Sequence, residues 1–358
     1  MTFTPRLEIY PKRIDANARS IINFCHASGI KVACVTKVTC AHPRVVQALE
    51  SAGADMLADS RLENLKAIRQ TGTRLPLMLL RIPTPSRSEE VVRYADISLT
   101  SSIETTRALS TAAVERKVKH QVILMVDVGD LREGIWPDQA IQIARETAAM
   151  PNLELIGLGT NLACYGGVIP TTDKMQMLIN LRSECNQATG LPLPVLCGGN
   201  SANLPLLLAG GMPQEINLLR IGETILLGRN VIDRSPWPGT RQDTFRLLAE
   251  VVELERKPSV PIGLRGQDAF GGTPQFIDRG VRQRAICNIG RQDVVVDNLE
   301  PEDNGMVILG GSSDHLLVDV EEASIPLHPG SEIAFYPGYG ALLAASTSPY
   351  VQKIVVEE

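Results

Sequence analysis

Eight short apolar runs alternate with amphipathic stretches over the first two-thirds of the chain, and this alternation restricts the fold more than any other feature. The runs are rich in Val, Ile and Leu. Near-continuous apolar strands joined by helices are typical of parallel strands that are buried on both faces. The eight runs cover 30–36, 54–59, 75–81, 95–100, 120–128, 153–161, 193–200 and 215–222.

The stretches between these runs, such as 102–117 and 173–190, space their apolar residues as a helix does. Eight β/α units in about 220 residues predict an α/β fold, a closed (β/α)8 barrel of the TIM type. An open doubly wound sheet is the alternative, but no glycine-rich turn of the dinucleotide-binding type follows the first run.

The pattern changes at the Pro- and Gly-bearing connector 233–242. Beyond it, turn residues separate short apolar runs and helical spacing is nearly absent, which predicts a mostly antiparallel β-domain. We therefore expect two domains, a barrel over 1–232 and a β-domain over 233–358. The predicted β-runs are 245–255, 284–290, 293–299, 305–311, 315–322, 331–337 and 350–358.

Composition excludes several classes of protein. The net charge of −5 argues against a general nucleic-acid binder, which needs a basic face. No apolar run reaches the ~20 residues that span a bilayer, and the first residues lack the apolar core of a secretory signal. The seven cysteines form no C-x-x-C pair and no zinc-like set, so we expect no metal. Buried free thiols in a reducing cytoplasm are expected, at positions such as Cys34, Cys164, Cys197 and Cys287.

In an α/β barrel the functional residues lie at the C-terminal ends of the strands. Lys37 follows the first apolar run. A lysine at the edge of an apolar interior has a lowered pKa, so its amine becomes a nucleophile suited to a Schiff base with a carbonyl cofactor. The alternative is a surface lysine on a loop.

Two glycine-bearing turns at the ends of the last two runs are candidates for an anion site. Asn200 and Ser201 stand in CGGNSA, and Arg220 and Gly222 in LLRIGETILLG. Such turns present N–H groups and hydroxyls to a phosphate. A simple helix cap at Asn200 or Ser201, and a structural ion pair of Arg220, are the alternatives.

Three further polar residues lie near the ends of central runs or just after them. Arg132 is a candidate for a bidentate clamp on a carboxylate, Asn161 for a contact with a cofactor ring, and Asp127 for support of the site. A structural role is the alternative for each of them.

Taken in order, these motifs resemble the fold-type III pyridoxal-phosphate enzymes, of which alanine racemase is the type member. The resemblance rests on the lysine after the first strand, on G-T-N, G-N-S and L-R-I-G at later strand ends, and on GGSSDHLLVDV in the β-domain. The alanine/ornithine racemase-like branch is suggested by KPSVPIG, DAFGG, NIGRQDV and GYGALLAASTSPYV.

The resemblance implies a role for each matched residue. Lys37 would carry pyridoxal 5'-phosphate as an aldimine and act as one proton-transfer base, while Arg220 would face the pyridine nitrogen. Because a guanidinium cannot accept a proton, this pairing favours racemisation over decarboxylation. Arg132 would hold the substrate carboxylate or the cofactor's phenolic oxygen. The other implied cofactor contacts are Asn161, Asn200, Ser201, Gly222, Glu223 and Tyr339.

The chain also departs from the family pattern. Asn161 replaces the family histidine that stacks on the cofactor, Met125 replaces a carbamylated lysine, and the tyrosine after the lysine loop is missing. Arg291 stands where the partner subunit's catalytic tyrosine would be, and arginine is a poor base. Arg291 would then bind substrate, and the candidates for the proton transfer are Asp293, Cys287 and Asp314.

From this resemblance we expect a cytoplasmic, head-to-tail homodimeric amino-acid racemase with two-base proton exchange at Cα. The expected substrate is an ornithine- or lysine-like amino acid, or a broad range of amino acids, and Ser313 and Asp314 would contact it; alanine or serine is the second choice. The rivals are a basic amino-acid decarboxylase, which Arg220 argues against, a non-catalytic binder of pyridoxal phosphate, and a zinc-assisted lyase. The last would need ligands beyond His315 and His328 in the β-domain.

Overall fold

The computed structural model of the protein describes residues 3–357. Contacts within the chain divide it into two compact units. One covers Lys12–Gln242; the other joins the N-terminal residues up to Pro11 with the chain from Asp243 onward. The sequence predicted one boundary, after residue 232. The N-terminal residues belong to the second unit because β1 (Arg6–Ile9) pairs with strands from the end of the chain.

The first unit is a closed barrel of eight parallel strands, which confirms the predicted fold class. Each predicted apolar run contains one strand, and the pairing of the first with the last, Ala33 opposite Arg220, closes the ring. The strands are β2 (Lys31–Val35), β3 (Met56–Asp59), β4 (Leu77–Leu79), β5 (Ile97–Thr100), β6 (His120–Met125), β7 (Leu153–Gly159), β8 (Val195–Gly199) and β9 (Leu218–Ile221).

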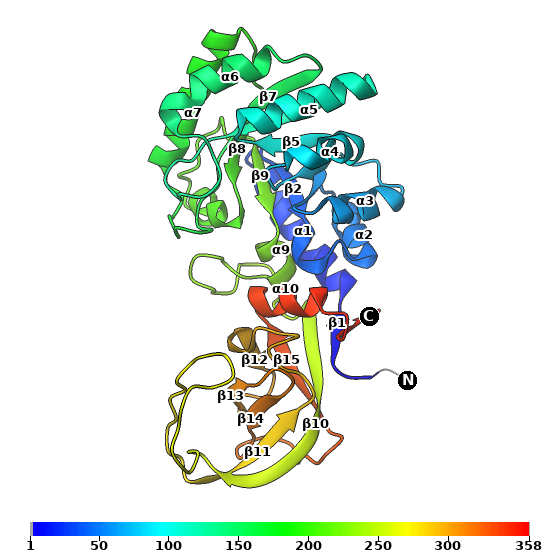
Figure 1. The fold of residues 1–358 in the computed structure, drawn as a ribbon, viewed down its shortest axis with the longest axis vertical. Helices are drawn as coiled ribbons and strands as arrows, with labels where there is room; N and C mark the ends of the chain where they lie inside the picture. The colour runs from blue at the N-terminus through cyan, green and yellow to red at the C-terminus, as the bar shows by residue number, and fades with distance from the viewer. Residues whose placement is uncertain (1–2, 358) are drawn as a thin grey trace. The chain divides into compact units, whose positions relative to one another are not determined.

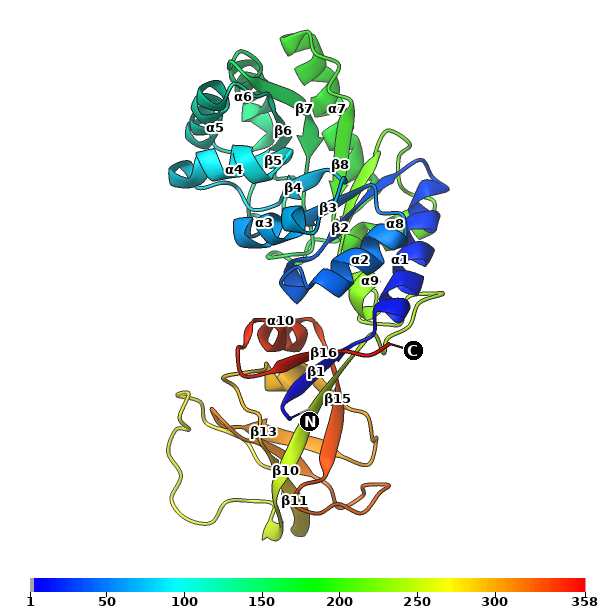
Figure 2. The ribbon, with the colours of Figure 1, turned by 90° about the vertical axis from the view of Figure 1, so that its right-hand side faces the viewer.

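Helices surround the barrel (Figures 1 and 2). They begin and end where the sequence supplies capping groups. Ser102 caps the fourteen-residue helix α5, and Thr171 caps α7, by accepting hydrogen bonds from backbone N–H groups. Gly190 ends α7 in the left-handed conformation at φ 70°. The helices are α1 (Pro11–His26), α2 (Pro43–Ser51), α3 (Leu62–Gln70), α4 (Ser88–Tyr94), α5 (Ile103–Arg116), α6 (Ala140–Ala148), α7 (Thr172–Thr189), α8 (Leu204–Leu208) and α9 (Glu223–Leu227).

The second unit is a mostly antiparallel sheet, as predicted, in the order β12-β15-β10-β11-β14-β13. In Figure 2, β1 lies between β10 and β16; it pairs antiparallel with the former and parallel with the latter. The strands are β10 (Phe245–Pro258), β11 (Val281–Cys287), β12 (Leu299–Pro301), β13 (Val307–Gly311), β14 (Leu316–Asp319), β15 (Glu332–Pro337) and β16 (Gln352–Val355).

Two local predictions for this unit are wrong. The run 293–299 forms a turn and the 3-10 segment Val296–Asn298 before β12 begins, because Asp293 and Val294 donate their N–H groups to Gly290 instead of to a neighbouring strand. A helix, α10 (Tyr339–Thr347), also forms where no helix was expected. Its residues are apolar and alanine-rich, so they lack the alternating polar face that marks a helix in a sequence.

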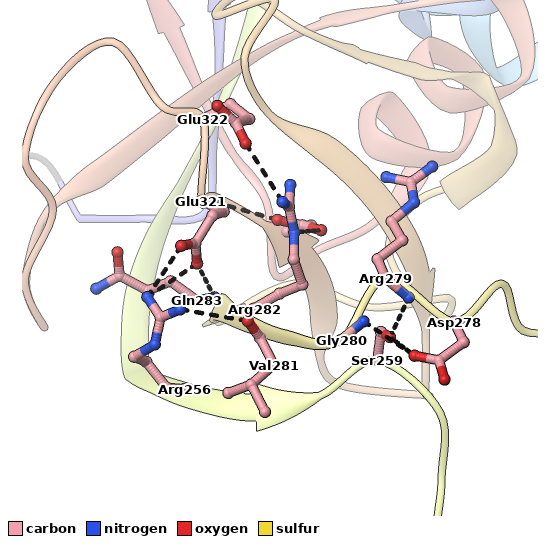
Figure 3. Close-up of polar contacts among 11 residues, drawn as sticks. Arg256, Ser259, Asp278, Arg279, Gly280, Val281, Arg282, Gln283, Glu321 and Glu322 are labelled. Carbon is pink, nitrogen blue, oxygen red and sulfur yellow. Dashed lines mark hydrogen bonds and ion pairs between the residues drawn. The ribbon is translucent and has the colours of Figure 1, made fainter.

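A long excursion, residues 259–280, leaves the sheet between β10 and β11, and Figure 3 shows the polar contacts at its two ends. Its two ends are joined, since the Ser259 hydroxyl donates to Asp278 at 3.1 Å and accepts the Arg279 N–H at 2.6 Å. Beside it, an ion pair at 3.0 Å links Arg256 to Glu321. The described helices include none that is long and apolar enough to cross a membrane.

The buried His120 predicts a specific loss of stability in acid. Burial lowers its pKa from 6.5 to about 4, and its ring contacts the Ser98 hydroxyl at 2.8 Å. Below pH 6.5 the unfolded chain binds a proton that the folded chain does not. The histidine therefore costs up to about 3 kcal/mol of folding free energy as the pH falls from about 6.5 to about 4.

The test is urea unfolding at about pH 7 and about pH 4.5. His120→Gln should lose less stability between these two conditions than the wild type does, whereas His315→Gln, which changes an exposed histidine, should behave like the wild type. An identical acid loss in the His120→Gln and wild-type proteins would contradict this prediction.

Candidate active site

Lys37 begins a 3-10 turn just after β2, at the C-terminal end of the barrel strand. The preceding residue, Thr36, is fully buried, and its hydroxyl donates to Asp59 at 2.6 Å, which ties the end of β2 to the end of β3. The Lys37 side chain is half-buried, and its amine has no hydrogen-bond or ion-pair partner among residues 3–357. The sequence placed this lysine correctly at the mouth of the barrel.

Burial is the main cause of a lowered pKa at the Lys37 amine. The positive charges of Arg132 and Arg220 lower the pKa further, while electrostatic interactions with the Cys164 and Asp59 side chains oppose the shift. A lowered pKa increases the share of the neutral, nucleophilic amine at neutral pH. Lys37 therefore has the properties that Schiff-base chemistry requires.

Arg220 lies on β9 and is only 5% exposed. One of its terminal nitrogens donates to the Thr160 carbonyl at 2.6 Å and to the Asn161 side-chain oxygen at 3.3 Å. Its Nε and the Asn161 Nδ2 are buried and have no acceptor within the described part of the chain. An unsatisfied buried donor costs about 1–3 kcal/mol, so both groups favour a ligand that brings acceptors to this place.

The predicted glycine turn after β8 is present. Gly199 adopts φ +125°, and a Cβ there would lie 2.9 Å from the Asn203 side-chain nitrogen, so a larger residue would not fit. Asn200 accepts the Ala202 N–H at 2.7 Å and donates to Asn161 at 3.2 Å. The hydroxyl of Ser201 forms no hydrogen bond with the described residues and is available to a ligand.

The turn after β9 is packed more closely. A Cβ on Gly222 would lie 3.0 Å from the Val35 Cβ, so the backbone can lie this close to β2 only without a side chain. Glu223 forms an ion pair with Arg234. Burial raises the pKa of its carboxyl group, and the charges of Arg234 and Lys37 oppose that rise. The Glu223 side chain is thus already engaged, which leaves its backbone as the group that can contact an anion.

Two aspartates shape the neighbouring loops. Asp127 accepts the N–H groups of Gly129 at 2.7 Å and Arg132 at 3.1 Å, so it supports the turn that carries Arg132. The Arg132 guanidinium is partly exposed and pairs with the adjacent Glu133. Asp130 is 1% exposed and holds the loop after β7 by accepting the N–H of Tyr165 at 2.9 Å.

Cys164 lies in that loop and is exposed. The prediction of a buried thiol is confirmed for Cys34, Cys197 and Cys287 and is wrong for Cys164. The Cys164 Sγ contacts the Asn200 side-chain nitrogen at 3.5 Å. The apolar run before it was interpreted as a strand, but β7 already ends at Gly159. The two glycines after Tyr165 were the available sign of a loop.

The other predicted site residues lie in the second unit. Arg291 donates from Nε to the Gly311 carbonyl at 2.9 Å, and its guanidinium lies 4.9 Å from the centre of the Phe270 ring. The Arg291 and Ser313 segments are hydrogen-bonded, since Gln292 N–H donates to the Ser313 carbonyl at 3.0 Å. The Ser313 hydroxyl donates to Asp314 at 2.7 Å. These three residues are therefore neighbours.

Asp293, Cys287 and Tyr339, the other predicted site residues of this unit, have surroundings that differ from those of Arg291, Ser313 and Asp314. Asp293 is buried and accepts the Ser348 hydroxyl at 2.7 Å. Cys287 is buried on β11, and burial raises the pKa of its thiol to about 12. Tyr339 is the first residue of α10. The side chains of Asp293 and Cys287 thus face the interior of their own unit.

Comparison with known proteins identifies the family. Residues 9–230 match the family described as alanine racemase, N-terminal domain. The chain is 43% identical to an ornithine racemase of Acetoanaerobium sticklandii over 98% of this chain and 99% of that protein. It is 39% identical to a lysine racemase of Thermotoga maritima, with 98% of each chain covered.

Solved structures agree on the fold. The alanine racemase of Streptomyces coelicolor A3(2) superimposes with a TM-score of 0.74 at 18% identity, and the match covers 99% of this chain and 98% of that one. An alanine racemase of Streptomyces lavendulae gives a TM-score of 0.73 at 17% identity and covers 100% and 98% of the two chains. From the matched domain and the full-length relatives together, the chain belongs to the alanine racemase family of amino-acid racemases.

Proposed function

We propose that the protein interconverts the L and D forms of a basic amino acid, ornithine or lysine, with pyridoxal 5'-phosphate at the mouth of the barrel. The substrate class is supported by the two full-length relatives, which are an ornithine racemase and a lysine racemase. The cofactor is supported most directly by the unpaired, half-buried amine of Lys37 with its lowered pKa.

The residues around Lys37 fit pyridoxal phosphate. The unsatisfied Nε of Arg220 suits an acceptor such as an unprotonated pyridine nitrogen. The free Ser201 hydroxyl and the close-packed backbone at Gly199 and Gly222 suit a phosphate group. When bound, this cofactor supplies the electron sink that makes the Cα proton of an attached amino acid acidic.

Three residues of the barrel unit have separate roles in the proposed reaction. Lys37 holds the cofactor and, as a neutral amine, accepts or returns a proton on its own side of Cα. Arg220 cannot accept a proton, so opposite the pyridine nitrogen of the cofactor it would leave that nitrogen unprotonated, which would weaken the electron sink and disfavour decarboxylation. Arg132 supplies a positive charge near Lys37, which supports the proposal that it holds the substrate carboxylate.

The roles that we propose for residues of the second unit come from the family resemblance. We propose a head-to-tail homodimer in which Arg291, Ser313 and Asp314 contact the substrate of the partner subunit, with Tyr339 near the phosphate. The guanidinium of Arg291 is oriented by its bond to Gly311 and by the Phe270 ring, which leaves its terminal nitrogens available to a carboxylate. The Asp314 carboxylate is exposed and suits a distal ammonium group.

The experiment on substrate class uses single L-amino acids with the cofactor-loaded enzyme. Because a site built for a distal cation leaves its carboxylate unpaired with alanine, kcat/KM for ornithine or lysine should exceed that for alanine at least about tenfold. Chiral chromatography measures the D product, and carbon dioxide release is followed in parallel. Lys37→Ala protein serves as the blank for contaminating racemases. A preference for alanine contradicts the proposed substrate, and carbon dioxide release contradicts the reaction.

The phosphate site is tested by Ser201→Ala. One hydrogen bond to a charged group contributes about 1.5–3 kcal/mol, so the dissociation constant for pyridoxal phosphate should rise about tenfold or more. Fluorescence titration of apoprotein with the cofactor measures it. The matched control is Ser183→Ala on α7, where the hydroxyl donates to Ile179 at 3.1 Å and away from the site. Equal affinity of the two variants would show that Ser201 does not contact the phosphate.

A further inference from the structure

A racemase that moves protons on both faces of Cα needs a second titratable group besides Lys37. In the barrel unit, five side chains show the largest electrostatic interactions with the Lys37 amine. They are Arg132, Arg220, Asp59, Glu223 and Cys164.

Four of the five are unsuited to the task. The two arginines hold their protons at any working pH. Asp59 is 0% exposed, and its oxygens are occupied by Thr36 at 2.6 Å and by the Arg61 N–H at 2.9 Å. Glu223 is committed to its ion pair with Arg234. Cys164 remains, as an exposed thiol.

Both the backbone and the side chain of Cys164 make contacts that fix its position. Its N–H donates to the buried Asp130 carboxylate at 3.2 Å, and its Sγ contacts the Asn200 Nδ2 at 3.5 Å. The same Asn200 nitrogen donates to Asn161, whose side-chain oxygen also accepts from Arg220. The thiol thus borders the cluster that holds the two unsatisfied buried donors, the Arg220 Nε and the Asn161 Nδ2.

We propose that Cys164 is the second proton-transfer residue and exchanges a proton with Cα on the face opposite to Lys37. This inference rests on the proposed racemase function. It also accounts for an arginine at position 291, because a site with its second proton carrier in the barrel does not need a base there. Of the three alternatives in the β-domain, Asp293 and Cys287 are buried, and Asp314 is proposed above to pair with the distal ammonium group of the substrate.

The proton balance closes without another reactant. In one direction the neutral amine of Lys37 takes the Cα proton and becomes an ammonium, while the Cys164 thiol gives its proton to the other face of Cα and becomes a thiolate. In the reverse direction the thiolate takes the proton and the ammonium returns one. Proton exchange with water restores the starting pair.

The decisive test compares racemisation with solvent exchange. Wild-type, Cys164→Ala and Cys164→Ser enzymes are loaded with cofactor, given L- or D-ornithine in deuterium oxide, and followed for the opposite enantiomer and for deuterium at Cα. Racemisation should fall at least about 100-fold in both variants, as expected for loss of a general acid–base group. Deuterium should still enter the one enantiomer whose proton Lys37 removes, near the wild-type rate. Cys185→Ala, which removes a buried thiol on α7, should match the wild type.

Two results overturn the inference. Unchanged racemisation in both variants would show that the thiol carries no proton. An equal loss of exchange from both enantiomers would show a merely structural role. If the wild type itself fails to racemise any basic amino acid, the proposed function fails, and that outcome is distinct from a wild type that racemises without needing Cys164.

A second measurement does not depend on activity. Iodoacetamide labelling mapped by mass spectrometry should modify Cys164 ahead of the five buried thiols in the cofactor-free protein. Pyridoxal phosphate with ornithine should slow labelling at Cys164 in the wild type, and should protect it far less in Lys37→Ala, which cannot anchor the cofactor. Equal labelling with and without these ligands would place the thiol outside the site and overturn the inference.

Discussion

The pairing of β2 with β9 is the interaction on which the site depends. It closes the barrel and sets Ala33 opposite Arg220, so the chain that leaves β2 at Lys37 emerges beside the strand that carries the guanidinium. Since parallel strands end at the same rim, β7 and β8 bring Asn161 and Asn200 to this edge as well. Arg220 therefore lowers the pKa of the Lys37 amine, although the two residues are 183 positions apart in the chain.

The electrostatics of the rim follow from this crowding. Arg132 and Arg220 place two guanidinium groups near the Lys37 amine, while the acidic groups of the rim are largely engaged by hydrogen bonds or ion pairs. Such a rim disfavours an additional cation and favours an anion. A cofactor phosphate and a substrate carboxylate would both reduce the repulsion, which also agrees with the unsatisfied donors of Arg220 and Asn161.

Much of this arrangement could be predicted from the sequence. The apolar runs specified the eight strands, and the strand-end rule then selected Lys37, Asn161, Asn200 and Arg220. What could not be predicted depends on distant partners. β1 forms because it pairs with β10, with Arg6 opposite Leu248, and no local sequence pattern predicts a strand that depends on so distant a partner. Cys164 is exposed in a loop that is held by Asp130, a residue much earlier in the chain. Function is thus carried partly by loops whose shape is set by tertiary hydrogen bonds.

The central claim is that the Lys37 amine forms the covalent link to pyridoxal phosphate. The most direct measurement is borohydride reduction of the protein incubated with the cofactor, followed by proteolysis and peptide mass mapping. The account predicts that the reduced cofactor is attached to the peptide containing Lys37 and to no other lysine. Attachment to a different lysine, or no attachment in protein that has bound the cofactor, would contradict it.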